Sequence, residues 1–224
     1  MSDLLTLEPF TDLAKCLHGA QLVGRNAFDC VGAGLGAFLS ELLDGLGVAD
    51  GPLVQGNVHA GAFVQGRVFV AKGATIEPTA YVQGPCYIGP GAEVRHGAYI
   101  RGQVYVGPEA VVGHTTEAKG AMFLDGAKAG HFAYVGDAVL GREVNLGAGT
   151  KLANLPLTRQ IIRVRHPTSD QMISTGLKKF SAILGDHVQT GCNCVLSPGS
   201  LLLPGTAVMP CVHFRGTLKR GLAK

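Results

Sequence analysis

An aliphatic residue recurs at every sixth position from Val58 to Val112. Four residues after each of them stands a small side chain, most often alanine. A helix would space its apolar residues three and four apart, and a half-buried strand would alternate them by two. A spacing of six instead predicts short strands separated by sharp corners. The full series is Val58, Val64, Val70, Ile76, Val82, Ile88, Val94, Ile100, Val106 and Val112.

This six-residue unit has a simple physical explanation. One aliphatic side chain per unit points into a narrow interior, and the small residue fits near the bend, where space runs out. Glycines such as Gly61, Gly66 and Gly73 cluster between the units and supply the backbone angles of the corners. Three units close a coil of about eighteen residues, and stacked coils pair their backbones about 4.8 Å apart. The pattern therefore predicts an all-β solenoid of hexapeptide repeats, a parallel β-helix, over residues 51–215.

Two stretches depart from the regular spacing. The sixfold pattern continues in a shifted phase from Leu140 to Leu152 and resumes from Leu184 to Val208, but residues 154–179 break it. We expect these residues to leave the coil as an excursion. Loops on rigid scaffolds often carry function, although a variable insertion without a role is equally compatible with the sequence. Residues 216–224 are expected to form a C-terminal tail.

The first fifty residues show a helical pattern, because Phe28, Val31, Leu35, Leu39 and Leu42 fall on one face. We expect residues 1–50 to be a helical segment that caps the end of the solenoid or docks on a neighbouring subunit, since a solenoid end must be covered. No strand precedes the nearby run of glycines, which excludes a dinucleotide-binding loop.

Charge is unevenly distributed along the chain. Residues 1–60 carry seven acids and two bases, whereas residues 61–224 carry seventeen bases and nine acids. A basic second part suits small anionic ligands such as phosphates or coenzyme A. There is no basic run that would indicate nucleic acid, no membrane-spanning apolar run and no basic leader, so we expect a cytoplasmic protein. The spacing of the six cysteines fits no zinc module, which favours reduced thiols.

One motif is specific enough to indicate a family. Residues 126–137 read GAKAGHFAYVGD, and residues 144–150 read VNLGAGT. These motifs resemble the acetyltransferase domain of the bifunctional enzymes that make UDP-N-acetylglucosamine in bacteria, and equally that of archaeal sugar-1-phosphate nucleotidylyltransferases, to which residues 180–191 are also similar. The resemblance covers about residues 85–210. It implies a left-handed coil, a homotrimer, acetyl-CoA as co-substrate and glucosamine-1-phosphate as acceptor. Because no nucleotidyltransferase domain precedes the repeat, we expect a stand-alone acetyltransferase.

The same resemblance assigns roles to individual residues. His131 corresponds to the family's general base, and an imidazole with a near-neutral pKa suits removal of a proton from an amine. Glu117 corresponds to a carboxylate near that base. The sugar-phosphate contacts correspond to Arg101, Lys119, Tyr134 and Asn145, and arginine and lysine suit phosphate because they combine charge with several donors. The coenzyme contacts correspond to Ala148, Asn154, Leu155, Cys192 and Pro210.

The sequence departs from the family at some of these positions. Cys192 stands where the family often has serine, and Leu155 stands where the bacterial enzymes have tyrosine. Lysines that follow the asparagine in archaeal relatives are replaced by Gln160 and Arg163. Handling of the coenzyme is therefore less closely determined by the resemblance than the base is.

Other functions remain open. The acceptor could be galactosamine-1-phosphate or a sugar nucleotide, and the chain could be a non-catalytic trimeric assembly module. A metal-dependent hydratase on the same scaffold needs two histidines five residues apart, which none of the eight histidines provides. His96 and His114 lie eighteen apart and should stack on successive coils, as half of a metal site or as surface neighbours. Acetyl transfer itself requires no metal.

Overall fold

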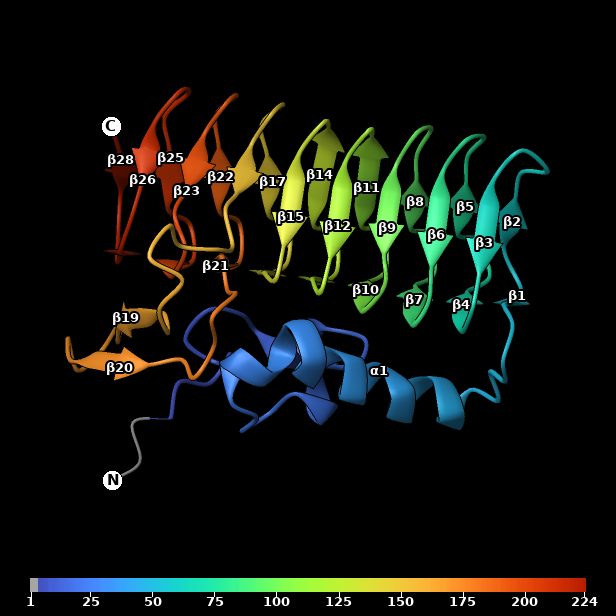
Figure 1. Ribbon diagram of the computed structural model, residues 1–224, viewed down its shortest axis with the longest axis horizontal. Helices are drawn as coiled ribbons and strands as arrows, with labels where there is room; N and C mark the ends of the chain where they lie inside the picture. The colour runs from blue at the N-terminus through green and yellow to red at the C-terminus, as the bar shows by residue number, and fades with distance from the viewer. Residues whose placement is uncertain (1–3) are drawn as a thin grey trace.

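The structure, a computed structural model, describes residues 4–224. The chain winds as a left-handed parallel β-helix in which three parallel sheets form the sides of a long prism (Figure 1). Successive strands pass from one sheet to the next, so each strand pairs with its equivalents one coil before and one coil after it. This confirms the fold class that the sixfold spacing and the family resemblance predict.

The three sheets are called A, B and C in the order in which the chain meets them. Sheet A consists of β1 (Leu53–Val54), β4 (Val68–Val70), β7 (Cys86–Ile88), β10 (Val104–Val106), β13 (Met122–Phe123), β16 (Val139–Leu140), β21 (Ala182–Leu184), β24 (Ser200–Leu202) and β27 (Thr217–Leu218). Sheet B consists of β2 (Asn57–Val58), β5 (Thr75–Ile76), β8 (Glu93–Val94), β11 (Val111–His114), β14 (Lys128–His131), β17 (Asn145–Leu146), β22 (Gln189–Thr190), β25 (Ala207–Val208) and β28 (Leu222–Ala223). Sheet C consists of β3 (Phe63–Gln65), β6 (Tyr81–Gln83), β9 (Tyr99–Arg101), β12 (Glu117–Lys119), β15 (Tyr134–Gly136), β18 (Lys151–Leu152), β23 (Val195–Leu196) and β26 (His213–Phe214).

The interior of the prism is filled by the residues of the sixfold series, most of them fully buried. The shifted phase after Val112 has a local cause at the corner between sheets C and A. In one coil Gln103 separates Gly102 from the buried Val104. One coil later the equivalent of Gln103 is missing, and Gly120 is followed directly by the buried Ala121. Tyr105 consequently pairs with Met122, seventeen residues on. The coil is one residue shorter, and the interior file continues unbroken.

The N-terminal segment forms a layer on the side of the prism, so the prediction that it caps the end of the solenoid is wrong. Docking on a neighbouring subunit stays a prediction. It contains 3₁₀ turns at Leu13–Lys15, Gly19–Gln21 and Ala27–Cys30, and one α-helix, α1 (Gly32–Gly45). The layer runs beneath sheet A along the long axis of the prism (Figure 1). It lies there because the outward-facing file of sheet A is apolar and needs cover. That file is Phe69, Tyr87, Tyr105, Met122, Val139, Ile183 and Leu201.

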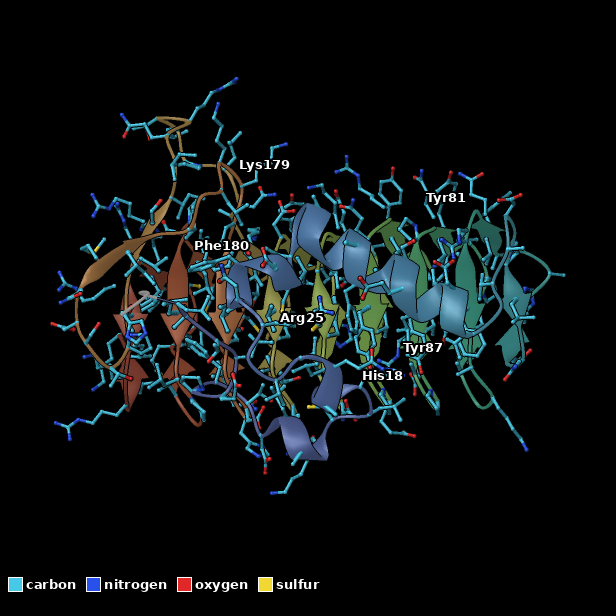
Figure 2. The ribbon with its side chains drawn as sticks, turned by 90° about the horizontal axis from the view of Figure 1, so that it is seen from below. His18, Arg25, Tyr81, Tyr87, Lys179 and Phe180 are labelled. Carbon is cyan, nitrogen blue, oxygen red and sulfur yellow. The ribbon has the colours of Figure 1, made fainter. Side chains whose placement is uncertain are left out.

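Aromatic and polar contacts fix this layer in place. Tyr87 stacks on Tyr105 with ring centroids 5.0 Å apart, and the His18 ring meets the edge of Tyr87 at 5.1 Å (Figure 2). Nδ1 of His18 is 2.9 Å from the Tyr105 hydroxyl. The layer therefore forms a second apolar core outside the prism.

Residues between β18 and β21 leave the coil and carry an antiparallel hairpin, β19 (Arg163–Arg165) and β20 (Met172–Ser174). The hairpin lies below the C-terminal coils in Figure 1. The prediction that residues 216–224 form a tail is wrong. These residues carry β27 and β28, which pair with β24 and β25. Leu218 and Ala223 pack against the interior at a spacing shorter than six, so the repeat continues without its sequence signal.

Within residues 4–224, no helix has the length and apolar character needed to cross a bilayer.

Candidate active site

His131 lies at the corner between sheets B and C, at the end of β14. Its backbone pairs with His114 of the preceding coil. The next coils place Ala148, Cys192 and Pro210 at the same corner. The backbone hydrogen bonds show this alignment: the carbonyl groups of His131, Ala148 and Cys192 accept from the N–H groups of Gly149, Asn193 and Cys211, respectively. The residue following His131, Phe132, has φ of 35°, in the left-handed region that makes the sharp bend. The predicted base and three of the predicted coenzyme residues thus share one corner file.

A groove of about 520 Å³ runs along sheet B beside this corner. His131, Asn145, Ala148 and Cys192 line it, together with charged side chains that include Lys128. Gly147 also lines the groove, and glycine is required there because a Cβ at this position would collide with the backbone of Gly191 and Cys192 in the next coil. Among residues 4–224, the His131 imidazole has no hydrogen-bond partner, so its ring nitrogens are open to a ligand in the groove.

The remaining predicted polar residues lie on the outer face of sheet C, on the other side of the same corner. Nη1 of Arg101 donates to Oε1 of Glu117 at 2.6 Å, and this hydrogen bond raises the pKa of Arg101. The partners are diagonal neighbours on adjacent strands, β9 and β12. Glu117 was expected to support the base. Within residues 4–224 its carboxylate instead holds Arg101 and makes no hydrogen bond to His131.

Lys119, one residue beyond Ala118 on β12, turns toward the corner between sheets C and A. Its Nζ lies 3.0 Å and 3.2 Å from the two carboxylate oxygens of Asp137, which also accepts a hydrogen bond from the Asn154 side chain. Lys119, predicted to contact the sugar phosphate, and Asn154, predicted to contact the coenzyme, therefore bind the same carboxylate.

Tyr134 lies among these residues. A Cβ on Gly136 would come within 2.5 Å of its hydroxyl oxygen, so the ring lies flat over that glycine. Burial raises the pKa of Tyr134, and the Asp137 and Glu117 carboxylates raise it further. The hydroxyl therefore stays protonated at neutral pH and is available as a donor.

Not every predicted residue joins these groups. Leu155 follows Asn154 into the excursion, where its side chain is 40% exposed, and it lines neither the groove nor the sheet C cluster. Pro210 shares the corner file but packs against Gly191, beyond the groove. His96 and His114 stack as predicted, with centroids 5.0 Å apart. The described part of the chain brings together no three metal-ligating side chains.

Asp137 is the residue that the sequence did not single out. It lies within the twelve-residue motif, but an acidic residue after a glycine is typical of an ordinary corner. Its equivalents in earlier coils are the glycines Gly120 and Gly102. The replacement of glycine by aspartate at this position of the repeat is the feature of the sequence that could have indicated Asp137.

The profile of the GMPPB C-terminal domain family matches residues 82–213, more than half of the chain. The chain belongs to this family. All of the candidate site residues, from Arg101 to Pro210, lie within the segment that matches the GMPPB C-terminal domain family.

Curated relatives match a shorter segment. A bifunctional sugar-1-phosphate nucleotidylyltransferase/acetyltransferase of Sulfurisphaera tokodaii is 39% identical over 79 residues, which cover 35% of this chain and 19% of the relative. The bifunctional protein GlmU of a Synechococcus species is 38% identical over 71 residues, 32% of this chain and 12% of the relative. The chain thus matches less than a fifth of the length of these proteins, and the resemblance predicted from the motifs is confirmed.

Solved structures are more distant. The UDP-N-acetylglucosamine acyltransferase of Francisella novicida has a TM-score of 0.36 and 12% identity, and the match covers 76% of this chain and 62% of that one. A hexapeptide transferase family protein of Anaplasma phagocytophilum has a TM-score of 0.35 and 14% identity, covering 74% of each chain.

Proposed function

We propose that the chain is an acetyltransferase that moves an acetyl group from acetyl-CoA to the amine of an amino-sugar 1-phosphate, with glucosamine-1-phosphate as acceptor. The observation that carries the proposal is the arrangement around one corner. Among residues 4–224, His131 lines a groove on sheet B without a hydrogen-bond partner. Arg101, Tyr134 and Lys119 lie on the adjoining outer face of sheet C, with Lys119 at its far edge. Membership of the GMPPB C-terminal domain family and the printed names of the curated relatives support the same reading.

In this proposal His131 is the general base. The neutral imidazole takes a proton from the acceptor amine as the nitrogen attacks the thioester carbonyl carbon. A backbone N–H near Ala148, beside His131 in the corner file, stabilises the developing oxyanion. Collapse of the tetrahedral intermediate breaks the carbon–sulfur bond, and the thiolate leaves with a proton as free CoA. The products are the N-acetylated sugar phosphate and CoA.

The sheet C cluster holds the acceptor. Arg101 and Lys119 supply donors to the phosphate, and each keeps a carboxylate partner, Glu117 or Asp137. The two pairs are neutral together, so phosphate binding depends on oriented N–H groups more than on net charge. Tyr134 adds a neutral donor, and Asn145 meets the sugar from the groove.

Two open faces meeting at one corner favour a homotrimer as the working unit. The groove on sheet B and the cluster on sheet C lie on faces that the N-terminal layer does not cover among residues 4–224, and in a trimer a neighbouring prism would face them. Small molecules, acetyl-CoA and the sugar phosphate, are the substrates in this proposal.

The deciding experiment is an assay of thiol release from acetyl-CoA against a panel of glucosamine, galactosamine and their 1-phosphates. We expect release with glucosamine-1-phosphate and little with unphosphorylated sugars. If galactosamine-1-phosphate or a sugar nucleotide is preferred, the acceptor assignment is wrong but the reaction class stands. No release above the background of His131→Ala, with any acceptor, would remove the proposed activity.

Arg101→Ala tests the phosphate contact separately. Its KM for the sugar phosphate should rise with little change in kcat, because a contact made equally in the ground and transition states is lost. The KM for acetyl-CoA should not change. An Arg101→Ala enzyme with a wild-type KM for the phosphorylated acceptor would contradict the role of this face.

A further inference from the structure

Asp137 has a buried carboxylate with more partners than a corner residue needs. Its side chain is 3% exposed, and its backbone has φ of 49°. The equivalent position one coil earlier is Gly120, with φ of 55°. Other left-handed corners of the solenoid carry polar side chains such as Glu109 and Glu143, so the bend alone does not distinguish Asp137. Its burial and its two side-chain partners do.

The carboxylate binds two side chains that belong to different parts of the proposed site. The Lys119 ammonium donates to both of its oxygens, and the Asn154 amide donates to Oδ2. Hydrogen bonds to a charged group are about twice as strong as neutral ones. Lys119 comes from β12, and Asn154 follows β18, two coils later.

Each partner gains a defined orientation from this contact. Lys119 ends a flexible four-carbon stem and is 27% exposed, so without Asp137 its ammonium would be free to turn into solvent. A carboxylate only accepts hydrogen bonds. Asn154 must therefore present its amide nitrogen to Asp137, which fixes the orientation of its amide group.

The backbone of Asp137 has a different task. Its carbonyl accepts hydrogen bonds from the backbone N–H of Ser181 at 2.9 Å and from the Ser181 hydroxyl at 3.3 Å, while Phe180 N–H donates to the carbonyl of Asn154. The Phe180 bond joins the two ends of the excursion, and the Ser181 bonds attach its end to the preceding coil. Phe180 lies at the root of the excursion (Figure 2). Closure of the excursion uses the main chain and can be separated from the carboxylate by mutation.

We propose that the Asp137 carboxylate is a positioning residue that holds Lys119 and Asn154 in one hydrogen-bonded unit and so couples the acceptor side of the site to the coenzyme side. This inference rests on the proposed function. It predicts that one buried charge, which touches neither substrate, sets the affinity for both.

The test compares Asp137→Asn with Ser181→Ala. Asparagine keeps the size but loses the charge and one acceptor, whereas Ser181→Ala removes only the hydroxyl bond to the carbonyl of Asp137. Isothermal titration measures the Kd of acetyl-CoA, steady-state kinetics measure the KM of the acceptor, and thermal melting monitors the fold. For Asp137→Asn we expect the Kd of acetyl-CoA and the KM of the acceptor each to rise about tenfold, as expected for the loss of one charge-assisted hydrogen bond. Ser181→Ala should leave both at wild-type values.

If Asp137→Asn does not fold, the Lys119→Met background answers the question, because no unpaired ammonium then faces the mutated residue. Comparison of Lys119→Met with Lys119→Met/Asp137→Asn should still show about a tenfold rise in the Kd of acetyl-CoA, through Asn154.

The outcomes separate the two proposals. A wild-type enzyme that transfers acetyl groups, together with an Asp137→Asn variant whose Kd and KM match those of wild type, overturns the positioning role alone. Equal weakening by Ser181→Ala also overturns it, because closure of the excursion would then explain the effect. A wild-type protein that neither binds acetyl-CoA nor releases CoA overturns the proposed function as well.

Discussion

Two histidines at equivalent corner positions of successive coils have different surroundings. His114 stacks on His96, and its Nδ1 lies 3.1 Å from the His96 carbonyl oxygen. His131 follows one coil later, pairs with His114 through the backbone and faces the groove. Gly147, Ala148 and Cys192 line the same groove as His131. Position along the prism therefore distinguishes the candidate base from its neighbour.

Replacement of His131 by alanine tests this distinction. The rate of acetyl transfer should fall by about two to four orders of magnitude, the loss expected for a missing general base. The Kd of acetyl-CoA should change little, because the proposed coenzyme contacts lie elsewhere. His114→Ala is the matched control and should retain the wild-type rate. A His131→Ala enzyme of near wild-type speed across pH 6–9 would show that another group removes the proton.

The cysteines give a second test of the groove. Cys192 and Cys211 are exposed, whereas the other four are buried. Burial raises the pKa of Cys16 and of Cys30 to about 12, and it also raises the pKa of Cys86 and Cys194, so these thiols stay protonated and unreactive at pH 8.

Titration of the native protein with a disulfide reagent at pH 8 should therefore modify two thiols rapidly, and all six after denaturation. In a Cys211→Ser variant, saturating acetyl-CoA should slow modification of Cys192, which lines the groove. Rapid reaction of four or more thiols in the folded protein would contradict the burial. Unchanged reactivity of Cys192 in the presence of acetyl-CoA would place the coenzyme elsewhere.

The N-terminal layer shows how an element outside the repeat contributes to stability. Leu39 of α1 is fully buried against the apolar file of sheet A, whereas Leu46, just beyond the helix, is 36% exposed. The layer and the outer face of sheet A thus share an apolar core that is separate from the interior of the prism.

Leu39→Ala should lower the free energy of unfolding by about 2–5 kcal/mol, because a cavity forms in a packed core. Leu46→Ala should change it by less than about 0.5 kcal/mol, as is usual for surface positions. Urea denaturation followed by circular dichroism measures both. Equal effects of the two substitutions would mean that the layer is not packed on sheet A in solution.

The layer also changes the expectation for a truncated protein. Removal of residues 1–50 should leave the β-sheet signal in circular dichroism, since the prism has its own interior, but it uncovers apolar residues of sheet A such as Tyr87 and Tyr105. We expect such a protein to aggregate, as large exposed apolar patches do.

At the level of the complete molecule, the two halves of the candidate site lie on different faces of one prism. Sheet A is covered by the N-terminal layer, whereas the outer faces of sheets B and C carry the groove and the polar cluster. These open faces are the ones available to neighbouring subunits. A site that uses both of them favours an assembly in which each corner meets another prism.

The proposed trimer should therefore have about three times the chain mass of 23.2 kDa in light scattering. The mass should be independent of ligand, since the assembly precedes catalysis. A monomer both with and without acetyl-CoA and sugar phosphate would count against the shared site, although activity of that monomer would leave the reaction itself in place.

The repeat could be predicted from the chain alone because it is local. Each six-residue unit contains its own aliphatic residue, small residue and corner, so the coil geometry follows from nearby residues. The motif around His131 is likewise contiguous, and the structure places Ala148 and Cys192 in its corner file. The C-terminal coil escaped prediction because its interior residues no longer keep the spacing of six.

Other features depend on which coils become neighbours. Arg101 meets Glu117, and Lys119 meets Asp137, only because stacking brings residues sixteen and eighteen apart side by side, and a one-residue shortening at one corner changes that register. The position of the N-terminal layer was decided in the same way. Amphipathic periodicity shows that a helix has an apolar face, but the surface that buries this face exists only once sheet A has assembled.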